Sequence, residues 1–439
     1  MRPASLSLPA VTLEPLHALL DIAFHDFQRN GASVDVVHHA LDDPSPLLLS
    51  KERAVPGRAA FSRVWERNRL AHTVSLAPAT AEGGAHGVPC HEVAPRIAVV
   101  PGDGVGREVV PEGIKVIRAL GLSFDFEELP WGCEHYERTG RMMPEDALST
   151  LAGYDAIYLG AIGWPTVPDH ISLWECLLPI RKTFEQYVNL RPVRLLPGIR
   201  CPLAGRGPAD IDMLFVRENT EGEYSGTGGR VHVGTEAELA VEVPVFTRRA
   251  IERCARYAFD RAQERSGRLV SVTKSNASRY SYVLWDEVVG GLAQNYPEVQ
   301  VERVHVDAMA ARMVLRPDTI DVVVASNLFA DILTDLGAAL QGSLGLAASA
   351  NLSLGGAGPS MFEPVHGSAP DIAGQGRANP VGAVWAGALM LRHLGYDAEA
   401  GRIERAIETV CAQGRVLTGD LGGTAATAEV GDALVGALR

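Results

Sequence analysis

Short apolar segments that alternate with helical stretches are the feature that most constrains the fold of this chain. The segments are rich in β-branched residues, and they lie at residues 97–100, 156–159, 213–216, 269–272 and 322–325. Strands separated by helices are typical of α/β proteins with a largely parallel sheet. The sequence therefore predicts an α/β fold from residue 96 onward.

Each of these segments is followed by a glycine-rich or polar cluster. In chain order the clusters are PGDGVG, GAIGWP, RENTEGEY, TKSN and SNLFADILTD. Ligands of open α/β sheets bind outside the carboxyl ends of the strands. We therefore expect the five clusters to meet at one large site.

The PGDGVG cluster at residues 101–106 does not fit the dinucleotide-binding fingerprint of Rossmann folds, because Gly106 comes one residue too early. We interpret it as a strand-to-helix turn in which Asp103 caps the helix. The predicted fold is therefore non-Rossmann.

Charge and cysteine content argue against several classes of protein. The formal net charge of −13 disfavours a nucleic-acid-binding protein, although local arginines can still bind small anions. No run of about 18 apolar residues occurs, so we expect no membrane span. The six cysteines are scattered without a C-x-x-C pair, which is typical of reduced thiols. We predict a cytoplasmic location.

The first 95 residues differ in character from the rest. Residues 1–75 form an N-terminal extension with two helical patterns, at 15–29 and 58–72. Residues 76–95 are small and rich in proline and glycine, which predicts a linker. The alternatives for the extension are a partner-docking segment, an autonomous helical addition and untranslated sequence.

A further segment shows strand-like alternation. Val231, Val233, Val241, Val243 and Val245 alternate with other residues. This pattern predicts a β-hairpin with one dry face, which is suited to an arm for dimer contact.

Three arginines are candidates for binding an anionic substrate: Arg181, Arg191 and Arg217. Guanidinium groups bind carboxylates bidentately, and a dicarboxylate would need two or three of them. Taken singly, each is better explained by a surface ion pair. Arg217 is the strongest candidate, because it directly follows an apolar strand.

Tyr224 and Lys274 are the candidate acid–base residues. A lysine in an electropositive, partly dry site loses proton affinity and can act as a base. The alternatives are ordinary packing for Tyr224 and a solvated loop charge for Lys274.

Asp331 and Asp335 give the sharpest local signal for a metal. They are four residues apart on a predicted helix, so both carboxylates share one face and repel each other unless a cation intervenes. Hard oxygen ligands suit Mg²⁺ or Mn²⁺, and Asp307 is a candidate third ligand. The alternative is that Asp331 caps the helix and Asp335 faces water.

The GSAPDIAG segment at residues 367–374 carries an acidic residue, Asp371. A carboxylate in such a loop can accept hydrogen bonds from a ribose 2′-hydroxyl, which would select NAD. On spacing alone, a plain surface loop is the better explanation of the segment.

Taken together, these motifs resemble the β-decarboxylating dehydrogenases that act on isopropylmalate, isocitrate and tartrate or D-malate. The resemblance runs from residue 96 to the C-terminus and rests on PGDGVG, LLPIRK, NLRP, VRENTEGEYSG, TKSN, VDAMAA, NLFADILTD and EPVHGSAPDIAGQGRANP. WPTVPDHISLW and EQYVNLRPVRLLPG are similar to the tartrate/D-malate subgroup. The resemblance implies an isopropylmalate-dehydrogenase-like two-domain fold with a parallel or mixed sheet. The cofactor-binding domain would span residues 96–186 and 342–439, and the domain for substrate, metal and dimerisation would span residues 187–341.

The resemblance also implies roles for the candidate residues. Arg181, Arg191 and Arg217 would hold the substrate carboxylates. Tyr224 would protonate the enol that forms on decarboxylation, and Lys274 of the partner subunit would take the hydroxyl proton during hydride transfer. A homodimer with shared active sites is therefore implied.

The implied cofactors are a divalent metal, Mg²⁺ or Mn²⁺, and NAD. Asp331 and Asp335 would bind the metal together with Asp307 of the partner subunit. The residues that would contact NAD are Asn276, near the nicotinamide, and Glu363, His366, Gly367, Ala369, Asp371 and Asn379.

Substrate choice is expected to depend on the segment before Arg181. Trp174, Leu177 and Leu178 lie there, and isopropylmalate enzymes usually carry an acidic residue where Trp174 stands. The bulky indole would shrink the space for a branched alkyl group, which favours D-malate or tartrate. The alternative is that Trp174 merely packs.

We therefore predict NAD- and metal-dependent oxidation, with β-decarboxylation, of a small 2-hydroxy diacid such as D-malate or tartrate. One alternative is 3-isopropylmalate dehydrogenase of leucine synthesis. Another is a non-catalytic regulatory or binding subunit of the same fold. Such a subunit should have lost the metal carboxylates or the Tyr224–Lys274 pair, and all of these are present.

Overall fold

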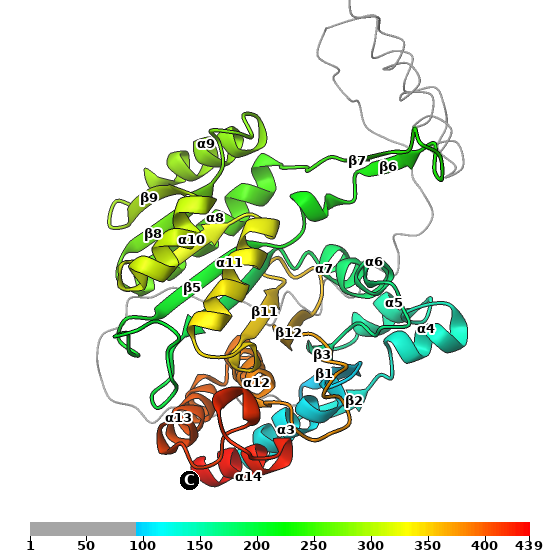
Figure 1. Cartoon of the computed structure of the whole chain (residues 1–439), viewed down its shortest axis with the longest axis vertical. Coiled ribbons are helices and arrows are strands. Elements are labelled where there is room, and N and C mark those ends of the chain that lie inside the picture. Colours follow the sequence, from blue (N-terminus) through cyan, green and yellow to red (C-terminus); the bar gives the residue numbers. More distant parts are fainter. Residues whose placement is uncertain (1–93) are drawn as a thin grey trace, which may run out of the picture. The chain divides into compact units, whose positions relative to one another are not determined.

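The computed structural model describes residues 94–439 (Figure 1). The predicted N-terminal extension at 1–75, with its helical patterns at 15–29 and 58–72, lies outside the described residues. The same holds for all but the last two residues of the predicted linker at 76–95.

One ten-stranded sheet organises the described residues, in the order β2-β1-β3-β12-β11-β4-β5-β10-β8-β9. The bounds in that order are Asp125–Glu128, Arg96–Gly102, Ala156–Ala161, Ser360–Pro364, Ala348–Leu352, Val188–Arg194, Asp212–Glu218, Val322–Ala325, Arg268–Thr273 and Gln300–His305. All five predicted apolar segments form strands of this sheet. The predicted α/β fold is therefore confirmed.

The sheet is mixed, because three neighbouring strand pairs are antiparallel. β11 runs antiparallel to both β12 and β4, and β4 runs antiparallel to β5, whereas every other pair in this sheet is parallel. β5, β10, β8 and β9 therefore run opposite to β1, β2, β3 and β12.

This topology corrects the expectation that all five polar clusters meet at one edge of the sheet. The clusters PGDGVG and GAIGWP follow β1 and β3 at one edge. The clusters after β5, β8 and β10 lie at the opposite edge, because those strands are reversed. The reversal depends on the β4–β5 pairing, which the spacing of apolar residues does not reveal.

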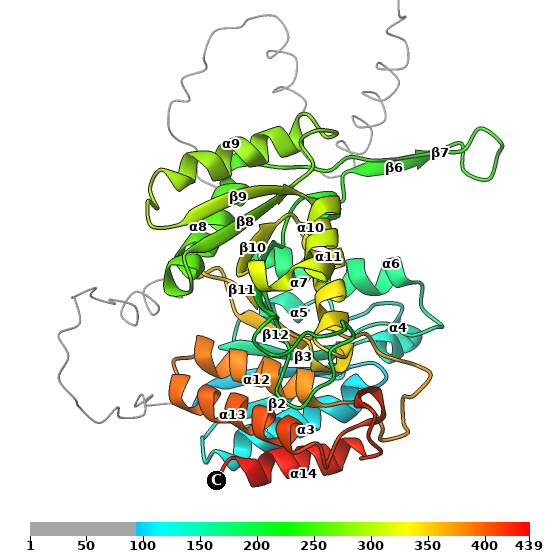
Figure 2. The same ribbon diagram turned by 60° about the vertical axis from the view of Figure 1, so that its left-hand side comes forward.

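Helices cover both halves of the sheet. Beside β1, β3, β12 and β11, four helices pack together: α3 (Gly106–Ala119), α12 (Val381–His393), α13 (Asp397–Gln413) and α14 (Thr427–Ala437). α12 is apolar on all sides, and it is accordingly buried along its first eleven residues. Figure 2 shows α12 between α13 and the sheet.

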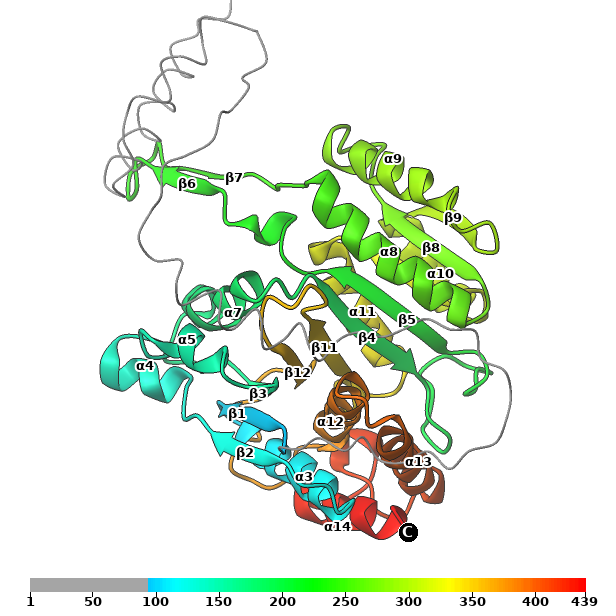
Figure 3. The ribbon, with the colours of Figure 1, turned by 180° about the vertical axis from the view of Figure 1, so that it is seen from behind.

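The other half of the sheet carries helices on its two faces. α8 (Arg248–Glu264) and α9 (Ser281–Ala293) pack together on one face, and α10 (Val306–Leu315) and α11 (Asn327–Leu340) pack on the other (Figures 1 and 3). α11 contacts β4, β5 and β10. It therefore places its side chains over the ends of these strands.

Smaller elements complete the described residues. They are the helices α4 (Cys133–Thr139), α5 (Ala147–Leu151), α6 (Asp169–Ser172) and α7 (Leu178–Thr183), with a π-helical turn at Leu173–Leu177 directly before α7. No helix among residues 94–439 has the length and hydropathy needed to cross a membrane.

The predicted hairpin is confirmed. β6 (Gly228–Val231) pairs with β7 (Leu239–Glu242) in a separate two-stranded sheet that extends away from the main one (Figure 2). Val233, Leu239, Val241 and Val243 are exposed in the single chain. The apolar side chains of the arm are therefore available for contact.

The predicted domain boundaries stay a prediction. The β11–β4 pair joins strands from the two predicted domains, so a single sheet runs through both.

Candidate active site

Arg217 is the centre of the candidate site. It lies at the carboxyl end of β5, and only 2% of its surface is exposed. Its Nε donates to Asn327 Oδ1 at 2.9 Å, and its Nη1 forms an ion pair with Asp331 Oδ1. Burial lowers the pKa of Arg217 to about 10, while Asp331 opposes this shift. The guanidinium therefore stays charged at neutral pH.

Arg191 reaches the same carboxylate from the neighbouring strand. The antiparallel pairing of β4 with β5 sets Asn189 opposite Arg217, and Asn189 Oδ1 accepts a 2.7 Å hydrogen bond from Arg191 Nε. Arg191 Nη1 donates to Thr334 Oγ1 at 2.7 Å and lies 3.2 Å from Asp331 Oδ1. The two buried arginines thus share Asp331.

Arg181 links this cluster to the other half of the sheet. It lies on α7 and is buried, and its Nη2 donates to Glu363 Oε1 on β12 at 2.9 Å. Asn351 Nδ2 donates to the same Glu363 oxygen at 2.8 Å. Arg181 Nε is buried without a hydrogen-bond partner. An unused buried donor of this kind suits a carboxylate ligand.

Tyr224 completes the cluster from a short 3-10 helix at Glu223–Ser225. Its hydroxyl donates to Asp331 Oδ2 at 2.9 Å, and the guanidinium carbon of Arg217 lies 5.6 Å from the centre of its ring. Burial and the charge of Asp331 raise the pKa of Tyr224. The phenol is therefore protonated at neutral pH and can act as a proton donor.

The two carboxylates on α11 have different environments. Burial alone would raise the pKa of Asp331, but Arg217 and Arg191 outweigh it and lower this pKa to about 2. Burial raises the pKa of Asp335, with Arg191 opposing the shift and Asp331 reinforcing it. Asp335 is exposed, as the alternative to a metal ligand expects, and its carboxylate makes no hydrogen bond or ion pair within the described residues. A divalent cation between the two would satisfy it, so these residues fit a metal.

Lys274 and Asp307 form a pair of their own. Lys274 directly follows β8, and its Nζ lies 2.5 Å from Asp307 Oδ1 on α10. Within residues 94–439, no hydrogen bond or ion pair connects this pair to Asp331 or the arginines. Asp307 is also not gathered with Asp331 and Asp335, because the described residues contain no group of three such ligands. One chain therefore holds two separate parts of the predicted site.

Trp174 lies on the π-helical turn before α7 and is 37% exposed. A π-helical turn inserts one extra residue and changes the direction of nearby side chains. The indole lies against Gly226, because a Cβ added there would meet its ring at 2.6 Å. Leu177 is half-buried and Leu178 is buried. Trp174 thus packs against the turn that carries Tyr224.

Five of the predicted cofactor residues follow β12, whereas Glu363 lies within β12 and Asn276 lies after β8. His366 Nδ1 lies 3.0 Å from Gly367 O, and His366 Nε2 is buried without a partner. Burial lowers the pKa of His366, so the imidazole is neutral. Asp371 is exposed, and its carboxylate makes no hydrogen bond within the described residues. These groups fit a nucleotide ligand.

The remaining cofactor-loop residues have structural contacts. Ala369 has a φ of 43°, in the region that favours glycine. Asn379 Nδ2 donates to Asp420 at 3.0 Å, and its Oδ1 accepts from the backbone of Val381 at 3.0 Å. Asn379 is therefore already held by the protein.

The cofactor loop rests on the PGDGVG turn. Val105 N donates to Ser368 O at 2.9 Å, and Gly104 has no room for a side chain against Ser368. Glu108 accepts hydrogen bonds from the amides of Gly374 and Gly376 at 2.6 and 2.8 Å. The first turn of α3 thus fixes the loop, through a contact that no sequence motif predicted.

The predicted role of Asp103 is wrong. α3 has no side-chain cap, and Asp103 instead accepts hydrogen bonds from the amides of Cys133 at 2.9 Å and Gly163 at 2.8 Å. The tight turn points the carboxylate away from the helix start and toward these two loops. Asp103 therefore ties the ends of β1 and β3 together.

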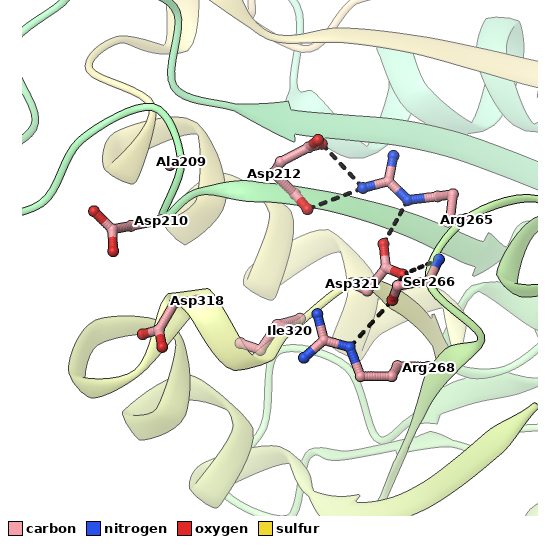
Figure 4. A pocket seen from close by; sticks show the side chains of 9 residues that line it. All are labelled: Ala209, Asp210, Asp212, Arg265, Ser266, Arg268, Asp318, Ile320 and Asp321. Carbon is pink, nitrogen blue, oxygen red and sulfur yellow. Dashed lines mark hydrogen bonds and ion pairs between the residues drawn. The ribbon is translucent and has the colours of Figure 1, made fainter.

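Two hollows lie away from Asp331. One of about 550 Å³ is lined by Asn276, Asp286, Arg303, His305 and other residues next to Lys274. The other, of about 380 Å³, lies at the amino ends of β5, β8 and β10 (Figure 4). There Arg265 is occupied by Asp212 and Asp321, so it has little capacity to bind an anion. None of the predicted site residues lines this second hollow.

Three amides and one hydroxyl that orient the arginines or Glu363 were not predicted from the sequence. They are Asn189, Asn327, Thr334 and Asn351, and each hydrogen-bonds to Arg191, Arg217 or Glu363. Asn189 stands within the NLRP motif and Asn327 within NLFADILTD, so their motifs were recognised but not their roles.

Comparison with known proteins gives consistent matches. A model of the isocitrate/isopropylmalate dehydrogenase family matches residues 96–434. D-malate dehydrogenase [decarboxylating] of Escherichia coli (strain K12) is 54% identical over 351 residues, covering 77% of this chain and 97% of that protein. Tartrate dehydrogenase/decarboxylase of Pseudomonas putida is 50% identical over 360 residues, covering 79% and 98%. The crystal structure of isocitrate dehydrogenase from Methylococcus capsulatus has a TM-score of 0.73 and 35% identity, covering 78% of this chain and 99% of that one.

Proposed function

The chain belongs to the isocitrate/isopropylmalate dehydrogenase family, and from this premise we propose that it is an NAD- and divalent-metal-dependent dehydrogenase of D-malate or tartrate. It oxidises the 2-hydroxy diacid and, with D-malate, decarboxylates it to pyruvate. The observation that carries the proposal is the buried group of Arg181, Arg191 and Arg217 beside Tyr224 and Asp331. Relatives named for D-malate and tartrate support the choice of substrate.

The residues of this chain divide the work of binding. Arg181 has a free buried Nε, and Arg191 and Arg217 present further donors, so a diacid can be held at both ends. Holding both carboxylates fixes C2 and its hydroxyl in one orientation. Asp331 and Asp335 would hold Mg²⁺ or Mn²⁺ beside the arginines. His366, Asp371 and their loop would hold the adenosine part of NAD.

Two proton transfers are assigned to side chains. The chemistry supplied by NAD and the metal, when bound, is hydride acceptance from C2 and polarisation of the C2 oxygen. Lys274 of the partner subunit would take the hydroxyl proton as C2 is oxidised. After carbon dioxide leaves, Tyr224 would donate its phenolic proton to the carbon that had carried the departing carboxylate. The raised pKa of Tyr224 keeps that proton in place until this step.

We also propose a homodimer with shared active sites. Lys274 and Asp307 stand apart from Asp331 in one chain, so a two-fold partner would have to bring the two parts together. The exposed apolar residues of the β6–β7 arm, including Leu239 and Val241, support a contact surface.

A cytoplasmic location is part of the proposal. The five cysteines within residues 94–439 are all free thiols, which supports a reducing compartment.

The function is tested by NADH formation with purified protein and Mn²⁺. D-malate, L-tartrate, 3-isopropylmalate and isocitrate are compared at equal concentration. We expect turnover of D-malate or tartrate and little turnover of isopropylmalate. Preference for isopropylmalate would place the chain in leucine synthesis, and inactivity on all four from folded protein would favour a non-catalytic subunit.

Trp174→Glu is expected to change substrate preference. The change removes the indole that packs on Gly226 and opens space for a branched alkyl group. We expect the ratio of kcat/KM for isopropylmalate to that for D-malate to rise about tenfold or more, since one or two added methyl contacts have roughly this effect. Steady-state kinetics with both substrates measure it. An unchanged ratio would mean that Trp174 only packs.

A further inference from the structure

Lys182 follows Arg181 on α7, and it is not used by the proposed mechanism. Its Nζ donates to the backbone oxygen of Ser225 at 3.0 Å. Ser225 is the residue after Tyr224, on the same 3-10 helix. A side chain next to a substrate-binding arginine therefore fixes the turn that carries the proposed proton donor.

The ammonium of Lys182 is held without a carboxylate. Within residues 94–439 it forms no ion pair, and its other neighbour is the ring of Trp174, whose centre lies 4.8 Å from Nζ. An aromatic face and a carbonyl oxygen both attract a cation. Burial lowers the pKa of Lys182, which is consistent with a lysine taken out of bulk water. The partly buried ammonium is therefore held between the turn and the ring.

The Tyr224 turn needs such support because it is bounded by glycines. Gly222 and Gly226 have φ angles of 72° and 81°, where the backbone reverses direction easily. On the side of the β6–β7 arm, the turn is held by Gly222 N donating to Val245 O at 2.8 Å and by Ser225 Oγ donating to Val243 O at 3.1 Å. From the α7 side, Lys182 supplies its hydrogen bond.

Trp174 is part of the same arrangement. Its ring lies over Gly226, so closely that a Cβ there would meet two ring atoms at 2.6 Å.

A lysine at position 182 is notable because lysine is rare in this chain: only four of the 40 lysine and arginine residues are lysines. An ammonium is a compact charge that can contact the aromatic ring and the carbonyl oxygen of the turn together.

We propose that Lys182 is a positioning residue, whose ammonium holds the Tyr224 turn against Trp174 so that the proton donor and the pocket wall are set together. This inference rests on the proposed function for its catalytic consequence. Its structural part, the fixing of residues 222–227, does not depend on which substrate is used.

The test uses the full chain with Lys182→Met, Lys182→Arg and a matched control, Lys115→Met. Lys115 pairs with Glu112 and Asp432 between α3 and α14, away from the site, so the control makes the same chemical change elsewhere. Amide hydrogen exchange of residues 222–227 is measured without substrate. kcat and KM are then measured with D-malate, NAD and Mn²⁺.

In Lys182→Met we expect exchange at residues 222–227 to rise about tenfold or more, as for loss of a hydrogen bond to a charged donor. We expect kcat to fall by a similar factor while the KM for NAD is unchanged. Lys182→Arg should restore most of the protection and part of kcat, because its guanidinium still donates to Ser225 O. Lys115→Met should change neither quantity.

Unchanged exchange in Lys182→Met would overturn the inference. Faster exchange with wild-type kcat would overturn its catalytic part. A wild-type chain that oxidises none of the diacids would instead overturn the proposed function, and the exchange data alone would still decide whether Lys182 holds the turn.

Discussion

Asp331→Asn is expected to lower kcat about a thousandfold or more while leaving the chain folded. Asp331 is the one carboxylate that contacts Arg217, Arg191 and the hydroxyl of Tyr224 among the described residues. Asparagine keeps the shape but removes the charge. The substituted site would lose a proposed metal ligand, and the buried arginines would lose their counter-charge. NADH formation with D-malate at saturating Mn²⁺ measures the effect.

The same substitution should have a limited effect on stability. Because the pKa of Asp331 is about 2 in the folded chain against an ordinary 3.8, its ionised form stabilises the fold at neutral pH. That contribution is complete above the ordinary pKa and is lost as the pH falls from about 4 toward 2. It amounts to at most about 2 kcal/mol, because part of the side chain is exposed to solvent. Asp331→Asn should therefore lower the unfolding free energy by a similar amount at pH 7, and by little at pH 2.

Asp318→Asn is the matched control. Asp318 is exposed and pairs with Arg206, outside the site. We expect its kcat to stay within about twofold of the wild type, as for most surface substitutions. If Asp331→Asn kept more than a tenth of the wild-type kcat while remaining folded, Asp331 could not be a metal ligand in the reaction.

The sequence predicted the parts of this chain whose residues carry a local pattern. The run at 322–325 coincides with β10, because four consecutive apolar residues are buried on both faces of a parallel sheet. The i, i+4 spacing of Asp331 and Asp335 likewise placed both on one helix, α11. Local spacing is sufficient wherever the structure depends on neighbours in sequence.

The sequence did not predict features that depend on pairing between distant segments. β4 was missed because Arg191, Pro192 and Arg194 interrupt its apolar pattern, although it lies inside the sheet between β11 and β5. Its charged residues are tolerated because Asn189, Thr334 and Asp331 satisfy Arg191. A strand that carries site residues therefore lacks the apolar pattern that would have predicted it. Because β4 was not predicted, the reversed direction of β5, β10, β8 and β9 could not be predicted either.

Because Lys274 lies apart from Asp331 in one chain, we expect mixed dimers of two inactive variants to recover activity. If each site takes Lys274 from one subunit and Asp331 from the other, Lys274→Met and Asp331→Asn should each abolish turnover in a homodimer. A mixed dimer of the two variants would contain one site with both residues intact and one site with both replaced. Mixing two inactive proteins should therefore create activity.

After unfolding and refolding of an equimolar mixture, about half of the dimers would be mixed, and one of the two sites in each would be intact, so about a quarter of the wild-type activity should appear. The same treatment of each variant alone should give none, and it serves as the control. If the mixture stays inactive while refolded wild-type protein regains activity, Lys274 and Asp331 must act within one chain. Lys274 would then have to leave Asp307, which it contacts at 2.5 Å, before it could reach the substrate.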